Sequence, residues 1–270
     1  MTSNQHRMCF NLYSLFNKPE CRVLVAGAKA NPIFPIESPD VFIGAHAGIY
    51  HANRFDASTF KIGIVTNWFL CKEALYCDTV REFIKNVKLD HLIVIESIRQ
   101  EYENILPSDL INIPTSAITR LSVWNCTLLE LSYLGFNYLS SLLSSLPPRK
   151  IIGFILQLLT EKTSYLTRLS TGMFSALYIY NLLPKSSLLA ISGIGLQLGG
   201  SYFFDRSNKM QKAGHYSQDI YIAAKLLRHS QSSTKRVIFT DPDAQKALLD
   251  LETTSMSSIV QKYLQSITKY

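Results

Sequence analysis

The chain has 270 residues and a mass of 30.5 kDa, a length that supports a large hydrophobic core without disulfides. Hydrophobic residues make up 47% of the chain and charged residues 17%, and 27 Lys and Arg against 20 Asp and Glu give a net charge of +7. This composition excludes a small disulfide-stapled domain and an intrinsically disordered chain.

The low charge content raises the question of a membrane-spanning protein. Two long runs carry no charge, 131–148 and 186–204. The first contains five serines and ends in Pro147-Pro148, and the second contains four glycines and Gln197. Neither run is the stretch of about 20 apolar residues that a spanning helix needs, so we expect a soluble or surface-bound protein.

The N-terminal segment and the cysteines indicate a reducing compartment. Residues 1–17 are interrupted by polar side chains, which makes them a poor signal peptide. The five cysteines, at positions 9, 21, 71, 77 and 126, form no CxxC pair and no metal-like spacing with the six histidines. We expect reduced thiols, a cytoplasmic protein and no metal site.

The first half of the chain alternates short β-branched runs with polar loops, a pattern typical of buried strands. The predicted strands are Arg22–Ala26, Asp40–Gly44, Lys61–Thr66 and His91–Glu96. Before the last of these, Asp78–Val87 has the apolar spacing of a surface helix. Strands, loops and helices at this density indicate a mostly parallel sheet covered on both faces.

The pattern changes between Thr127 and Leu166, which read as Leu- and Ser-rich helix broken at Pro147-Pro148 and followed there by Arg149-Lys150. One interpretation is a pair of amphipathic helices packed on the domain. The other is a membrane-surface or oligomer contact, with the basic pair facing anionic headgroups.

The rest of the chain continues the α/β pattern. The predicted elements are helix Thr171–Leu183, strand Ser187–Ser192, glycine-rich loop Gly193–Gly200, helix Gln218–His229, strand Arg236–Thr240, and helices Asp243–Leu251 and Ser255–Ile267. We expect an N-terminal extension over 1–18 and a single α/β domain over 19–270. A helical insertion over 127–166 and C-terminal helices over 243–270 belong to that domain.

The common catalytic fingerprints are missing from the sequence. The loop after the first strand reads Gly27-Ala-Lys-Ala-Asn31, which is neither GxGxxG nor a P-loop. No HExxH, GxSxG or kinase signature occurs. The one Asp-x-Asp in the sequence, Asp241-Pro-Asp243, suits a turn or a helix cap at its first residue. Basic residues form no stripe interleaved with aromatic residues, so we expect no nucleic acid partner.

Polar residues follow the predicted strands where a parallel sheet places its ligands. The loops after Ala26, Gly44, Thr66 and Ser192 should converge at the carboxyl edge of the sheet. They contain Gly27, His46, Asn67 and the segment from Gly193 to Tyr202.

Two further places could bind or act on a substrate. Arg168, Ser170 and Thr171 precede or begin a predicted helix, and a helix N-terminus with hydroxyls and a guanidinium is an anion site. The alternative is that Ser170 is only an N-cap and Arg168 only a solvated residue. His215 precedes another helix and could accept a proton near neutral pH, although an isolated loop histidine is more often a surface residue.

Four sets of segments between Arg22 and Leu251 carry a resemblance. They are Val23–Gly27 with Asp40–Phe42; Val65–Asn67; Thr167–Gly172 with Ser192–Ile194; and Gly199–Asp205 followed by Gly214-His215. In this order they resemble the bacterial sialyltransferases of the Campylobacter lipooligosaccharide type. The resemblance implies a modified GT-A-like fold with one Rossmann-like, mostly parallel sheet. It also implies metal-independent, inverting transfer of sialic acid, or a related keto-acid sugar, from a CMP-sugar to a glycan acceptor.

The resemblance also implies roles for matching residues. Gly27 looks like the glycine near the nucleotide, and Asn67 like the asparagine that holds the ribose or cytosine. Ser170 and Thr171, with Arg168 as a catalytic residue, are similar to the element near the donor carboxylate. The remaining assignments are Gly193 and Tyr202 as donor-binding residues, the latter at the leaving phosphate, His215 as the general base, and 206–214 as a lid.

Three departures from the family pattern keep a second hypothesis open. The family has Gly-Asn-Gly-Pro-Ser where this chain has Gly27–Asn31, and an asparagine expected after the second strand is replaced near Ala45-His46. Its Ser-Gly-Ile-Asp-Phe-Tyr segment appears here as Ser192–Gln197. The first hypothesis is a cytoplasmic glycosyltransferase acting on a cell-surface polysaccharide or lipooligosaccharide, with a peripheral membrane contact or a homo-oligomer as further expectations. The alternative is a non-catalytic, sialyltransferase-like nucleotide-binding or assembly protein.

Overall fold

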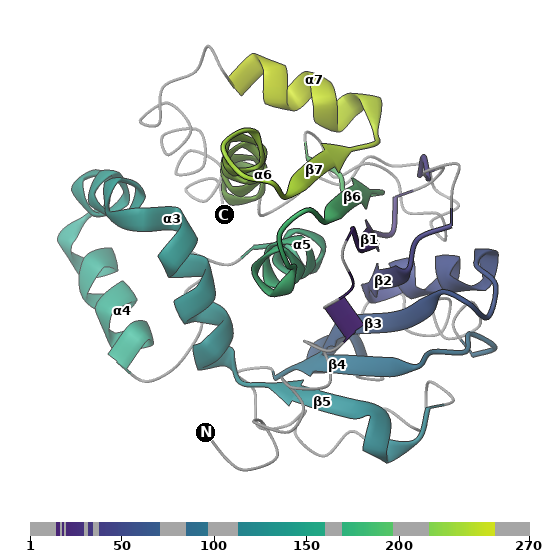
Figure 1. Cartoon of the computed structure of the whole chain (residues 1–270). Helices are drawn as coiled ribbons and strands as arrows, with labels where there is room; N and C mark the ends of the chain where they lie inside the picture. The colour runs from purple at the N-terminus through teal and green to yellow at the C-terminus, as the bar shows by residue number, and fades with distance from the viewer. Residues whose placement is uncertain are drawn as a thin grey trace, which may run out of the picture.

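A single seven-stranded sheet organises the chain, and every neighbouring pair of strands is parallel. Figure 1 shows the computed structural model, which describes residues 15–16, 18, 20–29, 32–34, 38–70, 85–96, 113–159, 169–196 and 216–251. The strand order is β5-β4-β3-β2-β1-β6-β7. This arrangement confirms the predicted α/β class with a Rossmann-like parallel sheet.

Each predicted strand is present, with its ends within one residue of the prediction. The strands are β1 (Arg22–Ala26), β2 (Val41–Ala45), β3 (Phe60–Thr66), β4 (His91–Ile95), β6 (Leu188–Ser192) and β7 (Arg236–Phe239). The first four and β6 are almost wholly buried, because helices and loops cover both faces of the sheet. Continuous apolar runs are what such strands require.

The sequence analysis missed one strand, β5 (Ile118–Leu121), which pairs with β4 at one edge of the sheet. It has only four residues, and Thr119 and Arg120 interrupt its apolar character. At the opposite edge, β7 alternates exposed and buried residues, as expected of a strand that is covered on one face.

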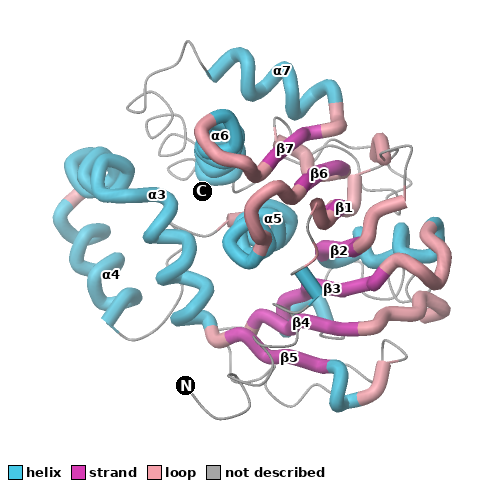
Figure 2. Tube along the Cα trace, in the orientation of Figure 1, coloured by secondary structure: helices cyan, strands magenta, loops and turns pink. Residues whose placement is uncertain are grey.

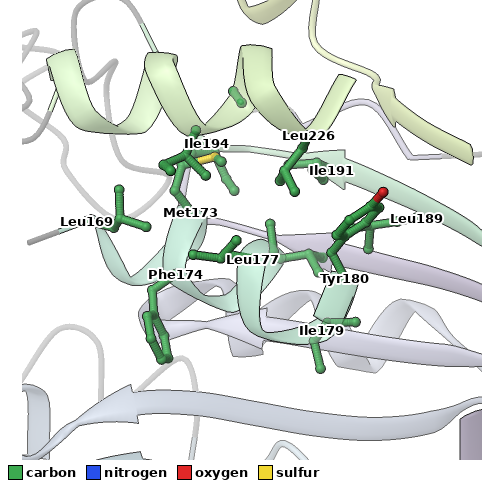
Figure 3. Close-up of a cluster of buried hydrophobic side chains, with 14 of the residues drawn as sticks. Leu169, Met173, Phe174, Leu177, Ile179, Tyr180, Leu189, Ile191, Ile194 and Leu226 are labelled. Carbon is green, nitrogen blue, oxygen red and sulfur yellow. The ribbon is translucent and has the colours of Figure 1, made fainter. Parts of the chain in front are cut away.

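Alternate residues of the strands contribute to two hydrophobic cores, one on each face of the sheet. On one face, Val23 and Val25 of β1 join a cluster that includes side chains of α5 (Thr171–Leu182) and α6 (Tyr216–Gln231). Figure 2 shows α5 beside the central strands and α6 beside the edge strand β7, and the close-up in Figure 3 shows Met173 and Leu177 of α5 within this cluster. On the other face, Leu24 and Ala26 contact a 3-10 helix, η1 (His46–Arg54).

The other helices and short turns frame this sheet. They are η2 (Asn67–Leu70), η5 (Thr115–Ala117), α3 (Val123–Ser145), α4 (Pro148–Leu159) and α7 (Pro242–Leu251). The prediction that the helical insertion starts at Thr127 is wrong, because Ser122 already caps α3 by accepting a hydrogen bond from the Asn125 N–H at 3.3 Å. The break at Pro147-Pro148 is confirmed.

Helices α3 and α4 form what we call the α3–α4 hairpin (123–159), at the side of the molecule in Figure 1. Helix α3 is kinked at Gly135, whose φ of 77° lies in the left-handed region that glycine adopts readily. Side chains of α6 satisfy carbonyl groups beside this kink. Lys225 Nζ donates to the Tyr133 carbonyl at 2.5 Å, and the Tyr221 hydroxyl donates to the Leu134 carbonyl at 3.4 Å.

Several predicted segments lie outside the described residues. These are most of the extension over 1–18, most of the helix Asp78–Val87, the end of the insertion over 160–166, the lid over 206–214 and the helix Ser255–Ile267. Lys85–Val87, the described end of the predicted helix Asp78–Val87, form a turn and a loop, so the prediction is wrong for these three residues. Among the helices of the described ranges, none is long and apolar enough to cross a membrane.

Candidate functional site

The chain reverses its direction of travel across the sheet between β1 and β6. From β1 it proceeds through β2, β3 and β4 to β5, and then returns to the other side of β1 to form β6. The loops after β1 and β6 therefore leave in opposite directions. Ligands of parallel α/β sheets bind outside the carboxyl ends of the strands at such a point.

Gly27 and Gly193 meet at this point of the sheet. A Cβ atom on Gly27 would lie 2.3 Å from the Gly193 carbonyl oxygen, so only glycine allows the two loops to approach this closely. Gly193 has a φ of 67°, which glycine tolerates. Its carbonyl also accepts a hydrogen bond from the Lys29 N–H at 3.0 Å. The two loops are thus bonded to each other.

Asp241 holds the loop after β6 through its carboxylate. Its carboxylate accepts hydrogen bonds from the Gly193 N–H at 2.5 Å and from the Ile33 N–H at 3.4 Å. Its own carbonyl accepts the N–H groups of Ala244 and Gln245, both at 3.1 Å, as α7 begins. The predicted cap or turn role of Asp241 is confirmed, and the contact with Gly193 is an additional one.

His46 connects three elements at the carboxyl edge. Its φ of 49° is unusual for a residue other than glycine, and its ring stacks on Phe69 with centroids 4.7 Å apart. The Nε2 atom lies 2.9 Å from Thr171 Oγ1 of α5 and accepts the Thr66 N–H of β3 at 3.3 Å. Because the backbone N–H can only donate, this contact favours the tautomer with hydrogen on Nδ1.

Asn67 follows β3 at the same edge. Its side chain is fully buried, and neither its amide nitrogen nor its amide oxygen has a hydrogen-bond partner among the residues that the structure describes. A buried amide without a partner costs about 1 to 3 kcal/mol. Such a group is what a polar ligand would satisfy.

The first residues of helix α5 lie at this edge of the sheet, because Thr171 contacts His46. Ser170 is the N-cap, and its side chain accepts a hydrogen bond from the Met173 N–H at 3.3 Å. The alternative that Ser170 acts as an N-cap is therefore confirmed, while a donor contact stays a prediction. Thr171 follows with its hydroxyl beside His46. The first N–H groups of a helix have no partner within it and carry partial positive charge.

Two buried carboxylates bind the main chain directly before α5. Glu130 of α3 accepts a hydrogen bond from the Leu169 N–H at 3.3 Å, and Asp219 of α6 accepts one from the Ser170 N–H at 2.9 Å. Both acids are at most 4% exposed. The entry to α5 is therefore fixed to two other helices, at the position that follows Arg168 in the sequence.

Burial dominates the ionisation of Asp219. Loss of water raises the pKa of this carboxyl to about 7, although hydrogen bonds from the side chain and backbone of Ser170 act in the opposite direction. A carboxyl with this pKa exchanges its proton near neutral pH. Since Asp219 bonds the N-cap of α5, its protonation state affects the start of that helix.

The structure brings together five of the predicted site residues at the carboxyl edge: Gly27, Asn67, Ser170, Thr171 and Gly193. Their predicted contacts with a donor are not tested by this arrangement. The other three, Arg168, Tyr202 and His215, lie outside the described residues.

The sequence analysis noted the loop that contains His46 but not its bond to α5, and it did not assign Glu130, Asp219 or Asp241 to the site. Two of these gave a local signal. Asp219 lies in the first turn of a predicted helix, and Asp241 precedes a proline at a helix start. Glu130 gave a weaker signal, because it is the single charged residue in the long helix α3.

Comparison with protein-family models, with curated proteins and with solved structures gives no match to this chain. The fold is therefore established by the sheet itself, and the function has to be argued from the site.

Proposed function

We propose that the protein is a metal-independent, inverting glycosyltransferase. Its donor would be the CMP derivative of sialic acid or of a related keto-acid sugar, and its acceptor a glycan of a cell-surface polysaccharide or lipooligosaccharide. The reaction would take place on the cytoplasmic side of the membrane. The family resemblance suggests this chemistry, and the arrangement of the carboxyl edge supports it.

The position of the α5 N-terminus carries the proposal. Thr171 lies 2.9 Å from His46 Nε2, so the helix begins beside the loop that follows β2. The partial positive charge of a helix start suits a carboxylate or a phosphate. A CMP-sugar of a keto acid contains both groups, and the site would bind one of them here.

Asn67 supports a nucleoside beside this anion site. Its buried amide offers one acceptor and two donors, none of which has a partner in the described part of the chain. A cytosine edge or a ribose hydroxyl would satisfy these groups. A site that hydrogen-bonds a ligand in this way also rejects analogues that lack the matching groups.

The proposed reaction is a direct displacement in which the protein forms no covalent bond with the sugar. The acceptor oxygen attacks the anomeric carbon, the bond from that carbon to the phosphate oxygen breaks, and CMP leaves with the electron pair. The proton of the acceptor hydroxyl passes to a base, for which we propose His215. This residue precedes the start of α6 at Tyr216, and α6 is bonded to the start of α5 through Asp219. Positioning and electrostatics supply most of the catalysis in such a transfer.

Release of CMP from CMP-sialic acid and from CMP-Kdo, measured by chromatography with and without glycan acceptors, tests the activity. We expect the His215→Ala variant to lose at least 100-fold in transfer rate, a typical effect of removing a general base, while its affinity for CMP in calorimetry is unchanged. The exposed His229 at the end of α6 provides the matched control, and His229→Ala should retain full activity. Full transfer by His215→Ala would remove this histidine from the mechanism.

One observation favours the alternative of a non-catalytic, nucleotide-binding or assembly protein. The Gly193 N–H is already bound by the Asp241 carboxylate, and the Gly193 carbonyl by the Lys29 N–H. The N–H has used its one hydrogen bond within the protein, and the carbonyl has used one of its two acceptor positions. Binding of CMP in calorimetry without turnover of either CMP-sugar would support a nucleotide-binding protein, and absence of both would contradict the transferase and the nucleotide-binding proposals and favour an assembly protein.

A further inference from the structure

The α3–α4 hairpin exposes most of the large apolar side chains found on the described surface. Seven large hydrophobic residues are exposed, and five of them lie in this hairpin: Leu128, Phe136, Ile152, Ile155 and Leu156. Isolated exposed apolar residues are common, but a concentration of them in one element marks a contact surface.

Helix α4 carries three of these residues on one side. Ile152, Ile155 and Leu156 follow the spacing i, i+3, i+4, which places them on one face of a helix. Their exposures are 59%, 46% and 54%. We call these three residues the α4 face. In Figure 1, α4 lies on the outer side of the hairpin, away from the sheet.

The charges of the hairpin have one sign at its surface. Its 37 residues include three charged ones: Glu130, Arg149 and Lys150. Glu130 is buried and bonds the Leu169 N–H, whereas Arg149 and Lys150 are exposed in the first turn of α4. The surface of the hairpin therefore combines apolar side chains with positive charge and presents no carboxylate.

The basic pair does not stabilise the helix in which it lies. Positive side chains in the first turn of a helix are repelled by its dipole, since the N-terminus is the positive end. Their position beside the α4 face is instead complementary to a surface that is negatively charged outside and apolar inside. A bilayer with anionic headgroups has this combination.

The length of α4 determines how it could engage a bilayer. Its 12 residues extend about 18 Å, well short of the roughly 30 Å of a hydrocarbon core. It would lie in the interface with its apolar face toward the acyl chains. The kink at Gly135, held by Lys225 and Tyr221 of α6, connects the hairpin to the sheet in one orientation.

We propose that the α3–α4 hairpin docks the protein on the surface of a membrane that contains anionic phospholipids, through the α4 face and the Arg149-Lys150 pair. This inference is independent of the transferase proposal. It assigns a partner surface to α4, of which the candidate site uses no described residue.

Vesicle sedimentation with the full chain tests the proposal. We expect binding to vesicles of phosphatidylcholine with 30% phosphatidylglycerol, little binding to phosphatidylcholine alone, and loss of binding in high salt. The Arg149→Gln/Lys150→Gln variant should bind about 30-fold more weakly, because each basic residue at an anionic surface contributes about fivefold. The Ile152→Gln/Ile155→Gln/Leu156→Gln variant should lose binding altogether.

Matched controls separate a local effect from a general one. Lys185→Gln/Lys246→Gln removes two exposed positive charges elsewhere, and Ile33→Gln/Ile238→Gln removes two exposed isoleucines outside the hairpin. Both controls should bind as the parent does. All substituted side chains are exposed, and circular dichroism checks that each variant is folded.

Two results would overturn the proposal. One is failure of the folded parent to bind anionic vesicles, or equal loss of binding in the control variants. The other is a dimer in sedimentation velocity that the α4-face variant abolishes, together with no vesicle binding, because the hairpin would then be an interface between two copies.

Discussion

The Asp219 carboxylate accepts a hydrogen bond from the Ser170 N–H at 2.9 Å, across 49 residues of sequence. Asp219 lies in the first turn of α6, and Ser170 is the N-cap of α5. This bond joins the N-terminal ends of two helices that pack on the same face of the sheet. With the bond from Glu130 to the Leu169 N–H, it fixes the chain that leads into the candidate anion site.

Asp219→Asn should change how stability depends on pH. Burial raises the folded-state pKa of Asp219 to about 7, above an unfolded value of about 3.9. Between these values the folded protein holds a proton that the unfolded chain has released, so the free energy of unfolding falls as pH rises from about 4 to about 7.

The asparagine variant retains a carbonyl acceptor for Ser170 and cannot ionise. The parent should therefore lose roughly 2 to 4 kcal/mol relative to the variant as pH rises through this range. Urea denaturation of both proteins from pH 4.5 to 7.5 measures the difference. A difference that stays constant or changes in the parent's favour with rising pH would show that Asp219 is already ionised in the folded protein at low pH.

Asp241→Ala should destabilise the fold by about 2 to 3 kcal/mol. The substitution removes the acceptor of the buried Gly193 N–H and of the partly exposed Ile33 N–H, and a buried orphaned donor costs about 1 to 3 kcal/mol. The control is Asp56→Ala, since Asp56 is exposed and its carboxylate bonds Ser58 and Thr59 in its own turn. Thermal and urea unfolding should show a much smaller change for the control, and equal changes would contradict a special role for Asp241.

Gly27→Ala should destabilise the protein by about 1 to 3 kcal/mol, the usual cost of overpacking. The new Cβ atom would lie 2.3 Å from the backbone oxygen of Gly193, which cannot move without breaking the contact between the two loops. Gly153→Ala is the matched control, because a Cβ there meets nothing within 4 Å. Within α4 this control should be neutral or gain up to about 1 kcal/mol. Similar losses for both variants would show that the contact at Gly27 is not the cause.

His46→Asn should weaken CMP binding by about five- to tenfold, a loss typical of one hydrogen bond. Asparagine tolerates the left-handed backbone at this position, but it lacks the ring that stacks on Phe69 and reaches Thr171. Calorimetry with CMP measures the change, and circular dichroism confirms the fold. His229→Asn, at the exposed end of α6, should bind CMP as the parent does. Unchanged affinity of His46→Asn would place His46 outside the proposed nucleotide site.

The buried strands could be predicted from sequence because they need apolar residues at every position. Val23–Ala26 and Ile62–Val65 meet this requirement without ambiguity. The edge strand β5 does not, since it buries one of four residues fully and carries Arg120. Its existence depends on pairing with β4, which local sequence does not encode. The start of α3 could have been predicted locally, because Ser122 is an N-cap residue.

The site was harder to predict than the sheet. Positions after the strands were expected to converge, and Gly27 and Gly193 do so because their strands are neighbours. The bonds from Asp219 and Glu130 join residues 49 and 39 positions apart. Such contacts follow from how helices pack on the sheet. No spacing of residue types along the chain predicts these contacts.

The carboxylates of Glu130 and Asp219 bond the N–H groups of residues 169 and 170 and not their side chains. Every amino acid except proline supplies that group. Related chains could therefore replace Leu169 with many other residues and keep the same attachment of α5. Divergence of the sequence just after Arg168 would then leave the attachment intact, so a consensus pattern written over these positions would fail to mark it. Glu130 and Asp219 are far away in sequence, and it is the residues at these two positions that show whether a related chain keeps the attachment of α5.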